Sequence, residues 1–297
     1  MLFKHVSRSI VLLLFLVGTK KAAAQYSEII NSDRPGATLS ASSLGNRVLQ
    51  WQVGGEYGQL RYSPRTTLQY SPGSVSNQNG GGFVYAMHYG LTERFDLGGS
   101  ITYSQTNTIE TRISRINTQL TYSIWTRGNI LKRDGFIPAV AIQGEILLPD
   151  SETEFYNYNI GGKITLMTDQ KLGGRTLLSS NLGVRLGGVP IGFYTLQLKI
   201  IASQVTFLYV EHFGEFGTNY ERFPQDDEVK SRLWYAGIDG GMGFIVHRNV
   251  QIDLYAGYAS WAVAPLPRYQ WFAGVGLSWR VKFKKKEKPA DSPTSKG

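Results

Sequence analysis

The sequence has 297 residues, 31 Lys and Arg against 22 Asp and Glu, 34 Gly, 17 Tyr and no Cys. The absence of cysteine excludes disulfides and thiolate metal sites. The net charge of +9 does not indicate nucleic-acid binding, because the excess lies in residues 1–24 and 284–297 rather than on a clustered basic face. We therefore expect neither nucleic acid nor a cofactor.

The chain begins with the pattern of an export signal. Lys4 and Arg8 come first, residues 10–17 form an unbroken apolar run, and three alanines at residues 22–24 precede Gln25. A membrane anchor is the weaker interpretation, because the apolar run is too short to cross about 30 Å of hydrocarbon as a helix. We predict a signal peptide over residues 1–24.

Period-two alternation recurs from residue 48 to residue 283. In residues 271–283 every second position, from Trp271 to Phe283, is apolar, while Gly274, Ser278 and Arg280 fall on the other face. Nine earlier segments show the same alternation: 49–57, 95–103, 116–124, 140–146, 158–166, 178–186, 194–200, 234–244 and 250–256. Two less regular segments, 83–90 and 205–213, complete the count. This pattern predicts an all-β fold, a closed antiparallel transmembrane β-barrel of about 12 strands over residues 48–283.

The predicted connections alternate in length. The first set is mostly short: residues 91–94, 126–134, 169–175, 202–204 and 247–249. The second set contains the longest loops: residues 58–81, 105–111, 148–156, 187–192, 214–233 and 259–270. Short periplasmic turns and longer outer loops are typical of outer-membrane barrels. We therefore expect both termini in the periplasm, outer-membrane lipid around the barrel and transient contact with the outer-membrane assembly machinery.

Aromatic residues gather near the predicted strand ends, as in the girdles of membrane barrels. They are Tyr57, Tyr89, Phe95, Tyr103, Trp125, Phe136, Tyr194, Phe213, Trp234, Tyr258, Trp271 and Phe283. In the alternative fold, a soluble secreted β-sandwich, aromatic residues would instead concentrate in the middle of the strands.

Polar residues in the opposite phase are predicted to line the lumen, because an Arg or Lys facing lipid near the midplane costs about 2–4 kcal/mol. They are Gln50, Gln52, Glu56, Gln119, Gln143, Glu145, Lys163, Arg185, Lys199, Asp239, Asp253 and Arg280. They would either line a solute path or form a hydrogen-bonded network that fills the lumen. We favour the network for most of them, because twelve strands enclose less space than the 16–18 strands of porins.

Glu211 fits neither phase clearly. Phe207 and Tyr209 place it on the lipid face, whereas His212 suggests the opposite register. A β-bulge would turn Glu211 inward, and near the outer rim it would instead reach lipid headgroups. Both alternatives stay open.

Two segments lie outside the strand pattern. Residues 25–47, the leader, contain Asp33 and Arg34 and show no alternation. The leader is either a plug, with Arg34 pairing Glu56 or Glu145 in the lumen, or a periplasmic linker. Residues 284–297 are rich in Lys and contain Pro and Ser, which predicts a disordered basic periplasmic tail.

Several short motifs resemble one family. Residues 31–36 read Asn-Ser-Asp-Arg-Pro-Gly, residues 48–56 form a strand with Gln and Glu, and residues 89–97 form a hairpin. Together with residues 239–241, 249–253 and 274–280, they resemble the outer-membrane transporter family of the meta-pathway of phenol degradation. The resemblance implies a transporter barrel for small, hydrophobic or aromatic solutes. One departure is that fourteen residues follow Phe283, whereas such barrels usually end on the aromatic of their last strand.

No catalytic or metal-binding pattern stands out. His88, His212 and His247 lie in unrelated contexts without metal-ligand spacing, so we expect no enzyme and no metal. The leading interpretation is a passive outer-membrane transporter of small solutes. The alternatives are a non-transporting barrel, structural or binding a partner through residues 58–81 and 214–233, and the soluble sandwich.

Overall fold

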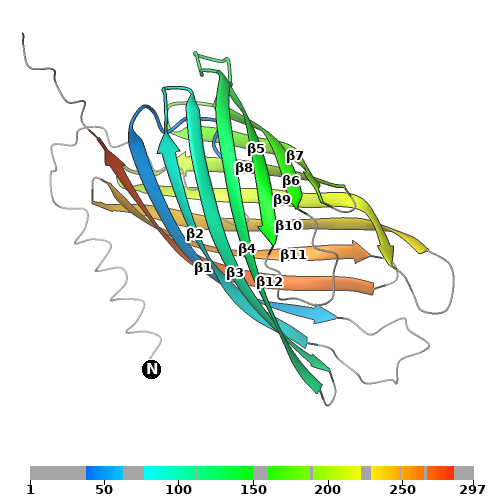
Figure 1. Cartoon of the computed structure of the whole chain (residues 1–297). Helices are drawn as coiled ribbons and strands as arrows, with labels where there is room; N and C mark the ends of the chain where they lie inside the picture. The colour runs from blue at the N-terminus through cyan, green and yellow to red at the C-terminus, as the bar shows by residue number, and fades with distance from the viewer. Residues whose placement is uncertain are drawn as a thin grey trace, which may run out of the picture.

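The computed structural model describes residues 38–62, 77–110, 113–149, 160–187, 190–221, 229–247, 249–263 and 266–283. Within these ranges it forms one closed antiparallel barrel, in which each strand pairs with its neighbours in sequence and β1 pairs with β12 (Figure 1). The strands are β1 (Val48–Tyr62), β2 (Asn77–Gly90), β3 (Phe95–Glu110), β4 (Ile113–Leu131), β5 (Ala139–Pro149), β6 (Gly161–Lys171), β7 (Thr176–Leu186), β8 (Ile191–Ile201), β9 (Thr206–Glu221), β10 (Val229–His247), β11 (Val250–Val263) and β12 (Leu266–Lys282). The predicted barrel of about 12 strands is confirmed, and the sandwich alternative is wrong. The described part of the chain contains no helix that is long and apolar enough to cross a membrane.

Side chains alternate between the two faces of the barrel wall, as the pleat of a strand requires. In β6, Ile164 and Leu166 are exposed on the outside, while Thr165 and Met167 are buried inside. Every strand carries at least one exposed large apolar residue: Val53, Tyr85, Ile101, Ile124, Ile142, Ile164, Leu182, Leu196, Leu208, Ile238, Leu254 and Leu277. The outer surface is therefore apolar around the whole circumference.

The two ends of the barrel differ. At one end, which we call the short-turn end, few residues separate consecutive strands: 91–94, 172–175, 202–205 and 248–249. The barrel chain also begins and finishes there, because the Arg47 N–H donates to the Gly90 carbonyl at 2.8 Å and the Phe283 N–H donates to the Arg47 carbonyl at 2.9 Å. The first and the last strand of the barrel, β1 and β12, therefore begin and finish at the short-turn end.

At the opposite end several strands run farther than the sequence predicts. Only residues 111–112 separate β3 from β4, and only residues 264–265 separate β11 from β12. The prediction of longer loops at residues 105–111 and 259–270 is therefore wrong. At the short-turn end, β4 also continues to Leu131, through part of the predicted connection at residues 126–134. An antiparallel ladder needs only backbone groups, so a strand can continue after its apolar alternation has ended.

Some aromatic rings point inward and lie over glycines of the neighbouring strand. Phe272 covers Gly257 in this way, and Trp125 covers Gly98. Trp125 and Phe213 are buried inside the barrel, so their predicted place in an interfacial girdle is wrong. A ring can lie flat inside the narrow lumen because the glycine opposite has no side chain.

Candidate functional site

The predicted lumen residues lie on the inner face of the wall, opposite the exposed apolar side chains. Five are buried: Gln50, Gln52, Gln143, Asp239 and Asp253. Five more are half-buried: Glu56, Glu145, Lys163, Lys199 and Arg280. Gln119 and Arg185 are exposed but keep the inward phase of their strands. The inner face of the barrel is therefore polar over much of its surface.

Cationic side chains of this set pair with oxygens of other strands. The pairs are Arg280 with Gln50 (3.0 Å), Lys163 with Glu145 (3.6 Å) and Arg185 with Glu215 (3.4 Å). Lys199 places its ammonium group 5.0 Å from the centre of the Phe207 ring. These cations thus find partners within the wall, as a lumen-filling network requires.

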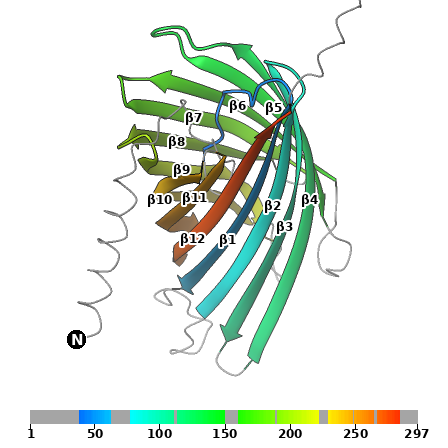
Figure 2. The same cartoon turned by 90° about the vertical axis from the view of Figure 1, so that its left-hand side faces the viewer.

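Residues 38–46 of the leader run inside the barrel from the short-turn end (Figure 2). Two aspartates of the wall hold them through backbone N–H groups and serine hydroxyls. Asp96 Oδ1 accepts from the Ser43 hydroxyl at 2.7 Å, and Asp169 Oδ2 accepts from the Ser40 hydroxyl at 2.6 Å and from the Ala41 N–H at 2.9 Å. Hydrogen bonds to a carboxylate are about twice as strong as bonds between neutral groups, so this strip of chain is firmly held.

Other wall side chains satisfy the carbonyl groups of the same strip. Arg127 Nη1 donates to the Ser40 carbonyl at 3.3 Å, and Asn129 Nδ2 donates to the Ala41 carbonyl at 2.8 Å. Ala41 also packs in a buried apolar cluster with Ala139, Ala141 and Met167. The segment inside the lumen is thus matched to the wall in both polar and apolar contacts.

Glu211 points into the lumen and is completely buried. Its Oε2 accepts hydrogen bonds from the Thr38 N–H at 2.6 Å, the Thr38 hydroxyl at 2.7 Å and Gln197 Nε2 at 3.1 Å. The pairing of β9 with both neighbours runs without a register shift, so no bulge is needed to turn it inward. The alternative that placed Glu211 on the lipid face is wrong, because Phe207 and Phe213 also point inward.

Asp33 and Arg34, the residues first considered for a plug, lie outside the described residues, as do the predicted signal peptide and residues 284–297. Sequence reasoning missed several leader contacts for a simple reason. Arg127 and Asp169 fall in predicted connections, although both continue the inward phase of β4 and β6. Extending the alternation by a few residues would have found them.

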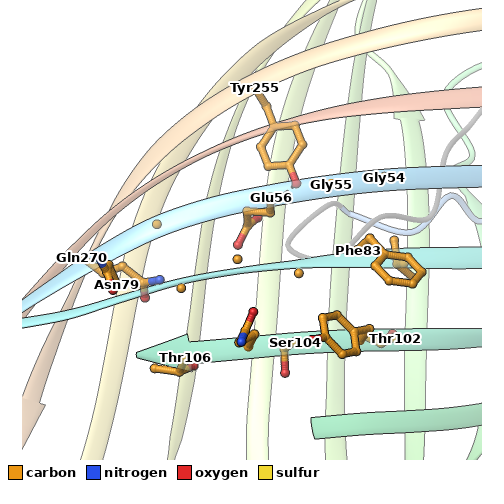
Figure 3. A pocket seen from close by; sticks show the side chains of 17 residues that line it. Gly54, Gly55, Glu56, Asn79, Phe83, Thr102, Ser104, Thr106, Tyr255 and Gln270 are labelled. Carbon is orange, nitrogen blue, oxygen red and sulfur yellow. Dashed lines mark hydrogen bonds between the residues drawn. The ribbon is translucent and has the colours of Figure 1, made fainter. Parts of the chain in front are cut away.

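A cavity of about 430 Å³ lies beside β1, β2 and β3 (Figure 3). Glycines make up much of its lining, so the wall there is thin: Gly54, Gly55, Gly58, Gly80, Gly81 and Gly82. Side chains of Thr102, Ser104 and Thr106 add polar groups. At one side Tyr255 and Glu56 point toward each other, and the tyrosine hydroxyl donates to Glu56 Oε2 at 3.0 Å (Figure 3).

Next to Tyr255 lies a cluster of inward aromatic rings, which we call the lumen ring cluster: Phe213, Tyr235, Tyr255 and Phe272, packed around Ala259. The centres of the Phe213 and Phe272 rings are 6.0 Å apart, and those of Phe213 and Tyr235 are 5.6 Å apart. The lumen therefore combines apolar rings with polar walls.

The histidines of the described chain are not brought together. His88 is buried in the lumen with its ring 4.4 Å from Trp125, whereas His212 lies on the outer face beside Tyr194. His247 is exposed where β10 ends. Within the described ranges no group of three His, Cys, Asp or Glu side chains is arranged to hold a metal ion.

No protein family model matches the chain, and no curated protein matches its sequence. Among solved structures, the chain is similar to an outer membrane channel from Pseudomonas putida F1, with a TM-score of 0.58 and 12% identity, over 84% of this chain and 100% of that one. Two others align more loosely. The transport unit of the autotransporter AIDA-I from Escherichia coli has a TM-score of 0.47 at 12% identity, over 80% of this chain and 91% of its own. The P. putida toluene transporter TodX has a TM-score of 0.42 at 7% identity, over 80% of this chain and 90% of its own.

At such identities the likeness shows the fold, and here only the first structure is close enough to support an argument. This chain therefore shares the barrel fold of a known outer membrane channel. The resemblance to the phenol-degradation family stays a prediction, because no family model matches.

Proposed function

We propose that this chain is an outer-membrane barrel that passes small solutes passively through its lumen. The observation that carries the proposal is a closed barrel that is apolar outside and polar inside, with an internal cavity. The fold it shares with the P. putida channel adds support. The outer side chains of the wall suit contact with hydrocarbon, and the inner side chains suit contact with water or solute.

The membrane setting is supported by the outer surface. Soluble proteins rarely expose an apolar patch of more than a few hundred Å², yet here exposed apolar side chains come from all twelve strands, among them Ile124, Leu182 and Ile238. A bilayer would cover this surface. We place the short-turn end, and with it both ends of the barrel chain, on the periplasmic side, as in other barrels of this kind.

The leader acts as a plug in this proposal. Residues 38–46 lie in the short-turn end of the lumen and are bound there by Asp96, Asp169 and Glu211. A solute that crosses the barrel along its axis must pass them. Transport then requires that at least part of this strip leaves its contacts with the wall.

The solute class follows from the lumen surface. The lumen ring cluster offers apolar contact, and the cavity beside Glu56 and Tyr255 offers room and hydrogen-bond partners. We propose small solutes with an apolar or aromatic body, in agreement with the family that the sequence resembles. Large polar solutes would meet a lumen already filled by its own side chains.

Liposome swelling tests the function. Vesicles containing the mature chain are diluted into small neutral solutes of increasing size, and the rate of swelling is followed by light scattering. We expect slow swelling with the full chain and a clear increase, limited to small solutes, after deletion of residues 25–45. Residues 46 and 47 are kept because Arg47 pairs with the wall at Gly90.

The matched control deletes residues 284–297 instead and should swell like the full chain. If neither deletion allows any solute to pass, the barrel is not a channel, and a structural or partner-binding barrel becomes the better account. If the full chain already passes solutes as fast as the leader deletion, the plug assignment is wrong while the channel stands.

A further inference from the structure

Two carboxylates face each other in the lumen without an obvious reason. Asp239 on β10 and Glu211 on β9 are directly opposite in the strand pairing and both point inward. Residues paired in this way have Cβ atoms about 4.5–5.5 Å apart, and like charges placed there repel. Glu56 adds a third negative charge that also acts on Asp239.

Asp239 is the more unusual of the two. Its side chain is only 5% exposed, and its Oδ1 is buried and accepts no hydrogen bond from any described residue. Glu211 Oε2 accepts from Thr38 and from Gln197, and Lys199 acts on the carboxylate as a nearby positive charge. Its other oxygen, Oε1, is buried and without a hydrogen-bond donor in the described chain. Buried carboxylate oxygens normally have partners, and a group with positive charge or donor protons would supply one to Asp239 Oδ1 and Glu211 Oε1.

Aromatic rings surround the same place. A Cβ built on Gly257 would lie 2.6 Å from Asp239 Cβ and 2.8 Å from Phe272 Cε2, so the carboxylate and the ring share one glycine as neighbour. Phe213 packs against Phe272 and is two residues from Glu211 on the same face of β9. Aromatic faces attract ammonium groups within about 6 Å of their centre, and they also accept a hydrocarbon chain.

We propose that Asp239 and Glu211, with the rings of Phe213 and Phe272, bind the ammonium group of a small organic amine. The body of the amine lies against the lumen ring cluster, which shares Tyr255 with the lining of the cavity of about 430 Å³ beside Glu56. The inference rests on the proposed function only in that small solutes can enter the lumen. It deepens that function by naming a charged class of solute that the lumen retains.

Binding is measured on the purified full-length mature chain in a non-ionic detergent by isothermal titration calorimetry. The probe is 2-phenylethylamine, which is protonated at neutral pH, and the neutral comparison is 2-phenylethanol, which has the same ring and chain. We expect the amine to bind at least about tenfold more tightly than the alcohol, since a buried ion contact combined with ring contacts is worth that much.

The decisive variant is Asp239→Asn, which keeps the shape of the side chain and breaks no hydrogen bond of the described structure. It should weaken amine binding at least about tenfold and change alcohol binding by less than about twofold. The matched control is Glu145→Gln, which removes one lumen carboxylate from β5, where it pairs with Lys163. It should leave both ligands unchanged.

Equal binding of the amine to the wild type and to Asp239→Asn would overturn the inference, as would an alcohol that binds as tightly as the amine. The second result would mean that the two carboxylates merely share a proton. Neither result touches the proposed function, because passage of neutral solutes is read separately by vesicle swelling. Amine binding without any solute passage would instead contradict the proposed function and leave the site standing.

Discussion

Thr38 and Glu211 lie 173 positions apart in the sequence and meet inside the barrel, where the Thr38 N–H and hydroxyl both donate to Glu211 Oε2, at 2.6 and 2.7 Å. This contact joins the leader to the middle of β9, which lies four strands from β1 around the barrel. It lies deeper in the lumen than the contacts of Asp96 and Asp169. The leader is therefore held at several points along its described length.

Removing a wall carboxylate that binds the leader should release the leader more often. Asp169→Ala removes the acceptor for Ser40 and Ala41, and each hydrogen bond to a charged group is worth about 1.5–3 kcal/mol. We expect conducting events in planar bilayers to become at least about tenfold more frequent. Asp134→Ala, which changes an exposed aspartate at the same end of the barrel, should have no effect. An unchanged event frequency in Asp169→Ala would show that Asp169 does not hold the leader in the closed state.

The pairing of rings with glycines predicts a stability difference. Gly257→Ala places a methyl group against Phe272 and 2.6 Å from Asp239 Cβ, and overpacking of this kind costs about 1–3 kcal/mol. Gly144→Ala is the matched control, because nothing lies within 4 Å of a Cβ there. The free energy of unfolding from urea titration in lipid vesicles should fall for the first variant and stay within about 0.5 kcal/mol for the second. Equal stabilities would show that Phe272 does not pack on Gly257.

The apolar outer face predicts a depth-dependent cost of charge. Leu182 in β7 is 56% exposed and Leu172 in the turn before it is 57% exposed, so the two differ in position along the barrel and not in accessibility. In a bilayer, Leu182→Arg should lower the free energy of unfolding by about 2–4 kcal/mol, while Leu172→Arg should cost no more than about 1 kcal/mol. Urea titration in vesicles measures both. A similar small cost at the two positions would argue against a membrane around the strands.

The strand pattern could be predicted because successive side chains of a strand point to opposite faces of the wall. One face contacts lipid and the other faces the lumen, so apolar and polar residues alternate along the strand. The alternation around Leu277 and Val275 in β12, for example, is visible without any knowledge of the partner strands. The inward phase of Gln50, Gln143 and Asp253 follows from the same rule. Local sequence is sufficient wherever one side chain in two must be apolar.

The remaining features depend on contacts between distant segments. Glu211 could not be oriented from the sequence because its neighbours Phe207 and Phe213 are apolar yet point inward, where they lie over Gly243 and Gly237 of the next strand. Ring and glycine form one unit across two strands, and the alternation of a single strand does not reveal it. The hydrogen bond from Ser40 to Asp169 could not be predicted either, since it joins residues 129 positions apart.

A disulfide between the leader and the barrel wall tests the solute path through the lumen most directly. The chain has no native cysteine, and Ala41 of the leader packs with Ala141 of β5 in one buried cluster. In the double variant Ala41→Cys, Ala141→Cys, oxidation should form a disulfide that holds the leader in place, with mass spectrometry verifying the bond. Single-channel recording should then show no conducting events until a reductant is added, after which events return to the wild-type frequency. Conduction that is the same before and after reduction, with the disulfide verified, would contradict a solute path through the lumen that the leader controls.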